Sequence, residues 1–447
     1  MRRRRKLLLD GTPMKDKKTP VSLTLLAAAL PLLMAVAPRP SAAQPLPGSL
    51  RVALPLDLVD SLDGAKFKIR IPANWNGTLL VYLQGTKLGP APVEPVLVPP
   101  VLPGSEPLEQ TLLSRGYALA ASQVATTEWQ QKAEAQDTFA LTTYFRGLVG
   151  EPKRTILLGT SLGGLATLRL IEESPRSFDA AIATCAPAAG TPKRFDRSLD
   201  FSLAYAAVFG WPDAWGPIDD LRPGINFVKD VNPIVPWPKP DGSNRGAWEF
   251  IRLVNGIPSD AFWGTDPLQG ATGFLMNMLW ATQQRETMEA WATGPVAQNA
   301  DHHYSLTPEE KAYLTGLGLK PDDLLTYMNS QVPVVACERC RDFAYRFGTV
   351  RGALTKPVIT LHTTADGLAD VSHESSYRAA VDVWGRADFL HQAFVTGVGH
   401  CAFTATQLLT TLTAMEKWLD TGIHPDASSF PETQGFDNHF VPPPWPY

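Results

Sequence analysis

The chain has 447 residues, of which 44% are hydrophobic and 19% charged, and its formal net charge is −4. A chain of this length and hydrophobic content can bury a large core, so we expect a globular protein. The nearly balanced charge lacks the basic excess that nucleic-acid binding requires, so we expect no nucleic-acid partner.

The N-terminus has the pattern of a secretory signal peptide. Three lysines between residues 15 and 18 precede an apolar run at 21–37, and small residues follow at 41–43. Pro31 interrupts the run, which is shorter than the roughly 20 residues that a spanning helix needs, so we expect no stable membrane anchor. We therefore predict a signal peptide at 1–43 and a secreted or periplasmic location.

The most informative motif is Gly159-Thr160-Ser161-Leu162-Gly163, which lies between a strand-like run at 155–158 and a helix-like run at 164–171. A serine at a sharp strand-to-helix turn adopts an uncommon backbone conformation. Small residues two before and two after it let the strand and helix approach closely. The motif predicts Ser161 as an exposed nucleophile and the backbone N–H of Leu162 as a donor to an oxyanion.

A long segment from about Pro187 to Gly348 follows, and it is rich in tryptophan. Seven of the chain's twelve tryptophans lie in it: Trp211, Trp215, Trp237, Trp248, Trp263, Trp280 and Trp291. Helical patterning at 198–209, 271–291 and 308–314 is separated by proline-rich connections. We expect most of these tryptophans to form a small core and some to line an apolar cleft. We interpret Asp301-His302-His303 as a solvated loop rather than a metal site.

A serine nucleophile needs a histidine base and a carboxylate that orients it, in the chain order serine, acid, histidine. Residues 356–362 read as a buried strand, and the loop after it carries Asp366 and Asp370. We favour Asp366 because the acid usually lies at the first turn after the strand, and Asp370 remains the alternative. Residues 390–395 read as the last strand, and the glycine-rich turn behind it presents His400 as the favoured base. The other candidates lack such a turn: His362, His373, His391, His424 and His439.

These motifs resemble the α/β-hydrolase fold, whose members are mostly esterases, lipases and related serine hydrolases. The resemblance covers roughly residues 65–186 and 350–420 and implies an α/β class with a mostly parallel central sheet. Residues 78–83 followed by Gln84-Gly85-Thr86 match the family's strand that ends in His-Gly. This match implies that the backbone N–H of Thr86 is the second oxyanion donor, and Gln84 stands where the family has histidine.

The resemblance also divides the chain. Residues 44–186 are the first part of the hydrolase core, 187–348 are a helical cap insertion, and 349–423 are the second part of the core. A proline-rich tail at 424–447 is expected to wrap the surface.

Four cysteines allow three pairings. Cys337 and Cys340 have the spacing of half a zinc site, but no second pair accompanies them, so we expect a local disulfide and no metal. In the hydrolase fold, Cys185 ends a strand at the catalytic edge and Cys401 adjoins the histidine, which implies a disulfide that tethers the histidine loop. Tannase-like esterases tether theirs through a cysteine beside the histidine, but their partner cysteine precedes the serine, where this chain has Thr160.

The serine, acid and histidine together predict hydrolysis of a small or polymeric carboxylic ester through an acyl-enzyme, without a cofactor. Two alternatives stay open: a serine peptidase of the same fold and a binding protein that kept the fold without catalysis.

Overall fold

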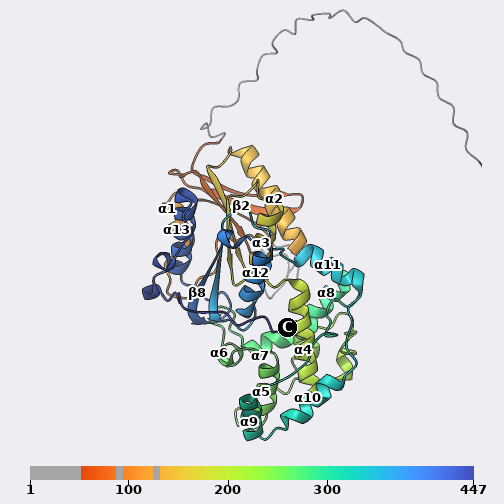
Figure 1. The fold of residues 1–447 in the computed structure, drawn as a ribbon. Coiled ribbons are helices and arrows are strands. Elements are labelled where there is room, and N and C mark those ends of the chain that lie inside the picture. The colour runs from red at the N-terminus through yellow and green to blue at the C-terminus, as the bar shows by residue number, and fades with distance from the viewer. Residues whose placement is uncertain (1–51, 87–93, 124–130, 447) are drawn as a thin grey trace, which may run out of the picture. The chain divides into compact units, whose positions relative to one another are not determined.

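An eight-stranded sheet forms the centre of the protein in a computed structural model, which describes residues 52–86, 94–123 and 131–446 (Figure 1). The strands are β1 (Leu56–Leu62), β2 (Ala65–Ile71), β3 (Thr78–Leu83), β4 (Ala118–Ser122), β5 (Arg154–Thr160), β6 (Ala180–Thr184), β7 (Val358–Ala365) and β8 (Leu390–Val398). Their order is β1-β2-β4-β3-β5-β6-β7-β8. Because only the pairs β1–β2 and β2–β4 are antiparallel, the prediction of a mostly parallel sheet is confirmed. The predicted signal peptide at 1–43 lies outside the described residues.

Helices cover both faces of the sheet (Figure 1). One face carries α2 (Gln131–Leu148), α3 (Leu162–Glu173) and α12 (Ser372–Val383), and the other carries α1 (Leu108–Ser114) and α13 (Ala405–Thr421). Strands β3 and β6 are buried at every position, as is expected of parallel strands that lie between two helical layers. In the edge strand β1 every residue is half-buried or exposed, because this strand has a neighbour on one side only.

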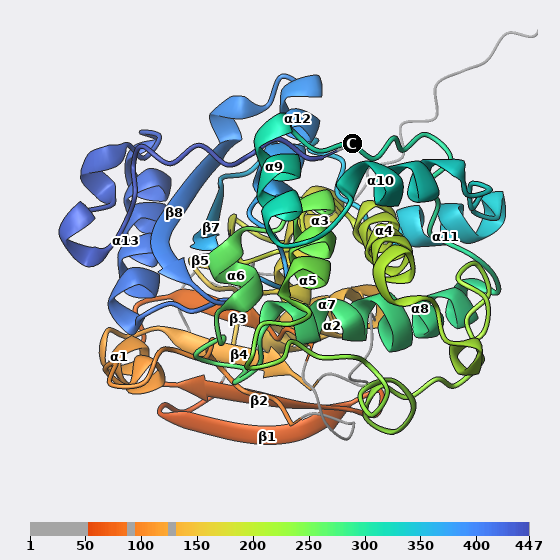
Figure 2. The same cartoon turned by 90° about the horizontal axis from the view of Figure 1, so that it is seen from below.

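The segment 187–348 is helical and lies beyond one end of the sheet (Figure 1), and the view from below shows its helices in front of the strands (Figure 2). Its helices are α4 (Thr191–Phe209), α5 (Arg245–Val254), α6 (Ser259–Trp263), α7 (Gly273–Leu279), α8 (Arg285–Ala292), α9 (Pro308–Gly316), α10 (Pro321–Ser330) and α11 (Glu338–Gly348), with short turns η1 (Asp213–Trp215), η2 (Phe227–Val231) and η3 (Trp280–Gln284). The helix expected at 271–291 is thus divided by η3, a π-helical turn between α7 and α8.

Most of the tryptophans of this segment form its own core. Trp215 and Trp248 are fully buried, and Trp237 stacks on Trp248 with ring centroids 5.8 Å apart. Trp211 packs edge-on against Trp215 at 5.0 Å. These rings therefore hold the helices of the segment together, as the sequence predicted for the majority of them.

The described part of the tail, residues 424–446, lies along the surface of the core and contains the short turns η5 (Ala427–Ser429) and η6 (Glu432–Gln434). Its end is held on α12, where Ser375 Oγ donates to the carbonyls of Pro442 and Pro443 and the Trp445 ring lies 4.8 Å from that of His373. Another short turn, η4 (Ala387–Phe389), precedes β8.

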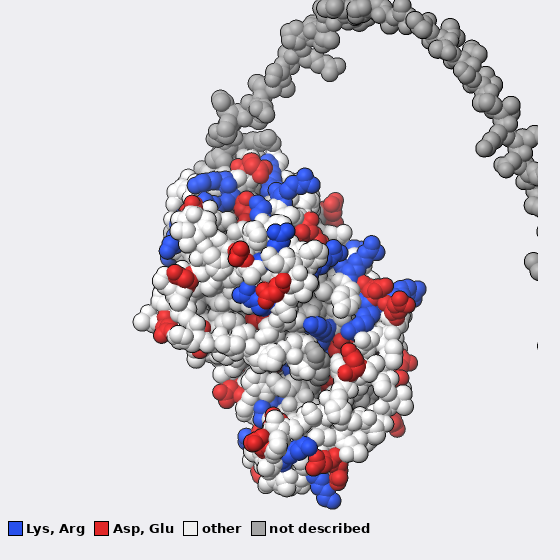
Figure 3. Space-filling model, in the orientation of Figure 1, with Lys and Arg blue, Asp and Glu red and all other residues white. Residues whose placement is uncertain are grey.

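Acidic and basic side chains are interspersed on the face shown in Figure 3, in keeping with the small net charge. A search of the described residues for a helix long and apolar enough to cross a membrane found none.

Candidate active site

Ser161 occupies a tight turn between β5 and α3. Its backbone has φ 57° and ψ −122°, a strained conformation for a residue with a side chain. A Cβ at Gly159 would lie 2.2 Å from the carbonyl oxygen of Gly163, and one at Gly163 would lie 2.2 Å from that of Leu83. Only glycine fits at either position, which is the requirement that the sequence motif predicted.

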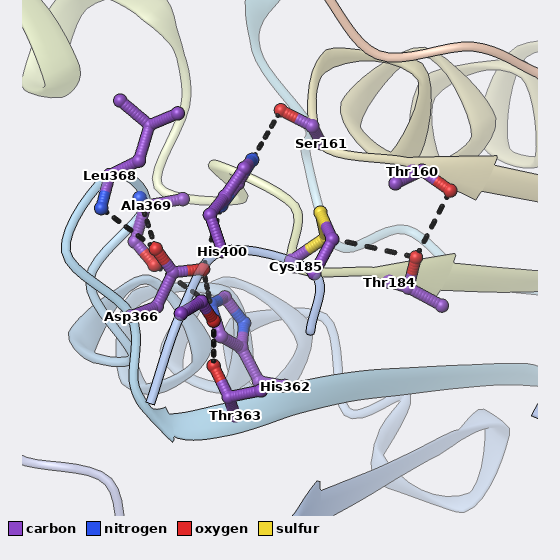
Figure 4. The surroundings of a disulfide bond; sticks show 12 residues. Thr160, Ser161, Thr184, Cys185, His362, Thr363, Asp366, Leu368, Ala369 and His400 are labelled. Carbon is purple, nitrogen blue, oxygen red and sulfur yellow. Dashed lines mark hydrogen bonds and ion pairs between the residues drawn. A yellow bond between two sulfur atoms is a disulfide. The ribbon is translucent and has the colours of Figure 1, made fainter. Parts of the chain in front are cut away.

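The structure brings Ser161, His400 and Asp366 together from the ends of β5, β8 and β7 (Figure 4). Ser161 Oγ lies 2.8 Å from His400 Nε2, and His400 Nδ1 lies 2.7 Å from Asp366 Oδ2. Asp366 Oδ1 accepts the backbone N–H groups of Leu368 at 2.8 Å and Ala369 at 2.9 Å. These contacts fix the carboxylate and the imidazole in one orientation relative to the serine hydroxyl.

The surroundings of Asp366 keep it ionised. Burial alone would raise its pKa, but the charge of His400 and the hydrogen bonds with His362 and His400 hold that pKa well below the usual range. A buried carboxylate that stays charged can hold the Nδ1 proton of His400 in place and stabilise the imidazolium that forms during catalysis.

Asp370, the alternative acid, has a different partner. Its Oδ2 lies 2.8 Å from Arg197 Nη1, and burial raises its pKa although Arg197 and Arg194 oppose that change. The geometry therefore places Asp366 at His400 and Asp370 in a buried ion pair with α4.

The two expected oxyanion donors flank the serine. Leu162 is the first residue of α3, and Thr86 lines the same cavity as Ser161. A Cβ on Gly85, the residue before Thr86, would lie 2.8 Å from the Cβ of Ser161, so the loop after β3 passes directly beside Ser161. With no substrate oxygen in place, the donor roles of Thr86 and Leu162 stay predictions.

Gln84 supports the loop after β3 although it replaces the family's histidine. Its Nε2 donates to the carbonyl of Ser122 at 3.2 Å and to that of Glu94 at 3.3 Å. These bonds tie the end of β3 to the end of β4 and to the far side of the loop, so the glutamine has a structural role at this position.

A cavity of about 80 Å³ opens beside the serine. Its described lining consists of Tyr82, Gly85, Thr86, Pro100, Thr160, Ser161, Gln269, Met276, Leu279, Trp280, Gln284, Leu368, His400 and Cys401. No Asp, Glu, Lys or Arg is among these described lining residues. Trp280 and Gln284 come from the two ends of the π-helical turn η3, so the helical segment supplies part of the wall. The size and lining of this cavity suit a small and largely apolar group beside Ser161.

In the structure, Cys185 is bonded to Cys401 and Cys337 to Cys340, the same pairs that the sequence analysis expected. The first bridge joins the end of β6 to the residue after His400. Within the described residues, one group of side chains has metal-ligand spacing, namely Cys185, His400 and Cys401, and its two sulfur atoms are bonded to each other.

Asp266 is a functional candidate that the sequence analysis missed. Its Oδ2 accepts the backbone N–H of His400, and its Oδ1 accepts those of Leu268 and Gln269, each at 2.8 Å. A residue of the helical segment thus holds the histidine loop from outside the core. The Asp-Pro pair at 266–267 was the available signal, since aspartate before a turn often binds backbone N–H groups two or three residues on.

The expectation for His302 was wrong. Its side chain is buried rather than solvated, and Nδ1 lies 3.0 Å from Asp200 Oδ1. Asp301, its neighbour, is exposed. The ring therefore belongs to the interior of the helical segment, where it is paired with a buried carboxylate of α4.

The strand order, the serine turn after β5 and the contacts of Ser161 with His400 and Asp366 define a protein of the α/β-hydrolase fold with a serine-hydrolase arrangement of side chains. No protein-family model matches the chain. The chain is 24% identical over 425 residues to the o-phthalyl amidase of Xanthobacter agilis. This alignment covers 84% of this chain and 89% of the amidase.

Solved structures with a similar course include an esterase from Aspergillus oryzae, with a TM-score of 0.40 and 13% identity over 83% of this chain and 80% of the esterase. Feruloyl esterase B from Aspergillus oryzae has a TM-score of 0.40 and 13% identity, over 82% of this chain and 80% of that enzyme. The amidase is itself a hydrolase, in agreement with the class that the fold and site define.

Proposed function

We propose that the protein is an exported serine hydrolase that cleaves carboxylic esters through an acyl-enzyme intermediate. The observation that carries the proposal is the chain of contacts from Ser161 Oγ through His400 to Asp366, at 2.8 Å and 2.7 Å. The predicted signal peptide and the two disulfides support export, because disulfides persist in oxidising compartments.

The proposed mechanism follows from this geometry. His400 Nε2 takes the proton of Ser161, and the alkoxide attacks the ester carbonyl. The backbone N–H groups of Thr86 and Leu162 bind the resulting oxyanion. His400 then protonates the leaving alcohol, and a water molecule activated by the same imidazole releases the acid from the serine. Asp366 holds the imidazole in the required tautomer throughout, and no cofactor is needed.

Ser161→Ala tests the nucleophile. Hydrolysis of p-nitrophenyl esters should fall by about 10³-fold or more while the protein stays folded, because the variant keeps the fold and loses the attacking oxygen. A fluorophosphonate probe should label the wild type and leave the variant unlabelled. Undiminished turnover in a folded variant would exclude the mechanism, and a wild type that neither reacts with the probe nor turns over esters would favour a non-catalytic binding protein.

Amide hydrolysis is a second candidate, favoured by the likeness to an o-phthalyl amidase. An amide requires the same serine and histidine, with a leaving amine that His400 must protonate. A panel that pairs p-nitrophenyl esters with matched anilides, and includes an o-phthalyl amide, separates the two by kcat/KM. The described cavity wall has no Asp or Glu that could bind a substrate ammonium group, so aminoacyl anilides should be poor substrates.

A further inference from the structure

A second histidine lies against the aspartate of the proposed triad. His362 is on β7, four residues before Asp366, and its side chain is completely buried (Figure 4). Its Nε2 lies 2.8 Å from the carbonyl oxygen of Ala369 and 3.4 Å from Asp366 Oδ2. Its Nδ1 lies 3.1 Å from Glu374 Oε1 on α12.

Both ring nitrogens of His362 therefore face oxygen atoms. A neutral imidazole has one N–H donor and one lone pair, so one nitrogen would direct its lone pair at a carboxylate or a carbonyl. Two protons on the ring satisfy all three oxygens. Burial alone would lower the pKa of His362, but its hydrogen bonds and charge interactions with Asp366 and Glu374 raise it to about 10.

Glu374 is itself fixed by neutral donors. Its Oε2 accepts from Thr360 Oγ1 and from Gln392 Nε2, each at 2.6 Å. Other ionisable groups also face this cluster. Arg194 on α4 and Asp370 interact electrostatically with Asp366, and His400 lies beyond it. On α12, Tyr377 interacts with Glu374, and burial lowers the pKa of His373 well below the ordinary value. His362 thus lies between two buried carboxylates, and Asp366 is shared by two histidines.

We infer that His362 is a positioning residue, an imidazolium that joins Asp366 to Glu374 and keeps the Asp366 carboxylate ionised and turned toward His400. The inference rests on the proposed function, since it assigns a role with respect to that triad. Its consequence is that the enzyme works at lower pH than it would with an uncharged residue at 362. A cation behind Asp366 opposes protonation of that carboxylate, which holds the His400 ring in place.

The protonation state can be measured directly in the wild-type protein. Histidine-selective ¹⁵N NMR at pH 7 to 8 should show a ring with both nitrogens protonated whose signal is missing in His362→Gln. In Glu374→Gln the ring should lose its second proton at a lower pH, because one of the two carboxylates is gone. A neutral-tautomer pattern for His362 at pH 7 would overturn the inference, whichever nitrogen carries the proton.

Kinetics test the positioning role. In His362→Gln the acid limb of the pH profile of kcat/KM should move up by about one pH unit. This is the size expected when a charge on the far side of Asp366 from His400 is lost, at an effective dielectric constant near 20. We expect kcat to fall by about tenfold with KM changed by less than twofold. The matched control is His391→Gln on the neighbouring strand β8, whose ring stacks on Phe430 at 4.7 Å and whose loss should leave the acid limb in place.

A purely structural role for His362 would lower the melting temperature and leave the acid limb unchanged, and that result would refute the inference. If His362→Gln does not fold, the wild-type and Glu374→Gln spectra still decide the question. The proposal that Ser161 is the catalytic nucleophile and the inference about His362 can be refuted independently of each other. Turnover by Ser161→Ala would refute the catalytic proposal without changing the spectrum of His362, and a neutral His362 would leave the Ser161 result intact.

Discussion

Replacing Cys185 and Cys401 with alanine removes a disulfide that spans 216 residues. In the chain-entropy model, a link over so long a loop destabilises the unfolded state by about 5 kcal/mol. Cys337 and Cys340 are separated by 3 residues, and the same model assigns their bridge about 2 kcal/mol. The double variant Cys337→Ala/Cys340→Ala is therefore a matched control that removes the same number of sulfur atoms.

The long bridge should also matter for activity, because Cys401 directly follows His400. Without it, the histidine loop keeps the hydrogen bond from Thr363 Oγ1 to the carbonyl of Gly399 at 2.7 Å and the contact of the His400 N–H with Asp266. We expect a partial loss, with kcat/KM lowered by about 10- to 100-fold, since small displacements of a catalytic group have effects of this order. The control pair should change kcat/KM by less than twofold.

Guanidinium unfolding followed by tryptophan fluorescence gives the two free energies, and ester hydrolysis gives the rates. Peptide mapping under non-reducing conditions should first find Cys185 joined to Cys401. Equal free-energy losses in the two double variants, or full activity without the long bridge, would refute the reasoning. A Cys185 peptide joined to Cys337 or Cys340 would refute the pairing itself.

Two further predictions concern the acid and the loop beside the serine. Asp366→Asn should lower kcat by about 10⁴-fold, because it leaves His400 in the wrong tautomer. Asp370→Asn should mainly lower the free energy of unfolding, by about 3–5 kcal/mol, because it leaves the buried charge of Arg197 without its ion-pair partner. Kinetics and denaturation of both variants check this, and a larger loss of kcat in Asp370→Asn would assign the role of triad acid to Asp370. Gly85→Ala should abolish most activity in a folded protein, because the new Cβ would lie 2.8 Å from the Cβ of Ser161. Gly147→Ala is the control, since its Cβ would meet nothing within 4 Å, and it should leave kcat/KM unchanged.

Local motifs were sufficient to predict the strand-to-helix turn at Ser161, and their resemblance to a known family predicted the class of fold. The strain at Ser161 and the close approach of β5 to α3 depend on glycines two residues away, so a short stretch of sequence reveals them. Chain order and strand-like runs likewise pointed to His400 and to the loop that carries Asp366. The mostly parallel sheet was implied by the resemblance of these motifs to the α/β-hydrolase fold, and the structure confirms it.

Contacts between distant parts of the chain decided the rest. Asp366 and Asp370 lie on one loop, and only the position of Arg197 on α4 and of His400 after β8 separates their roles. Asp266 reaches the histidine loop from the helical segment, 134 residues earlier in the sequence. No local pattern reveals the contact between Asp266 and the His400 loop, because the sequence around a single carboxylate does not show which distant backbone group it will bind.

His362 shows the same limit most clearly. In the sequence it is one histidine within an apolar strand, and its apolar neighbours indicate only that it is buried. Its charge depends on Asp366 in the following loop and on Glu374 from α12, which the fold places on opposite sides of the ring. The amino-acid pattern predicts where a side chain is buried, but its protonation depends on the oxygen atoms that the folded chain brings to it.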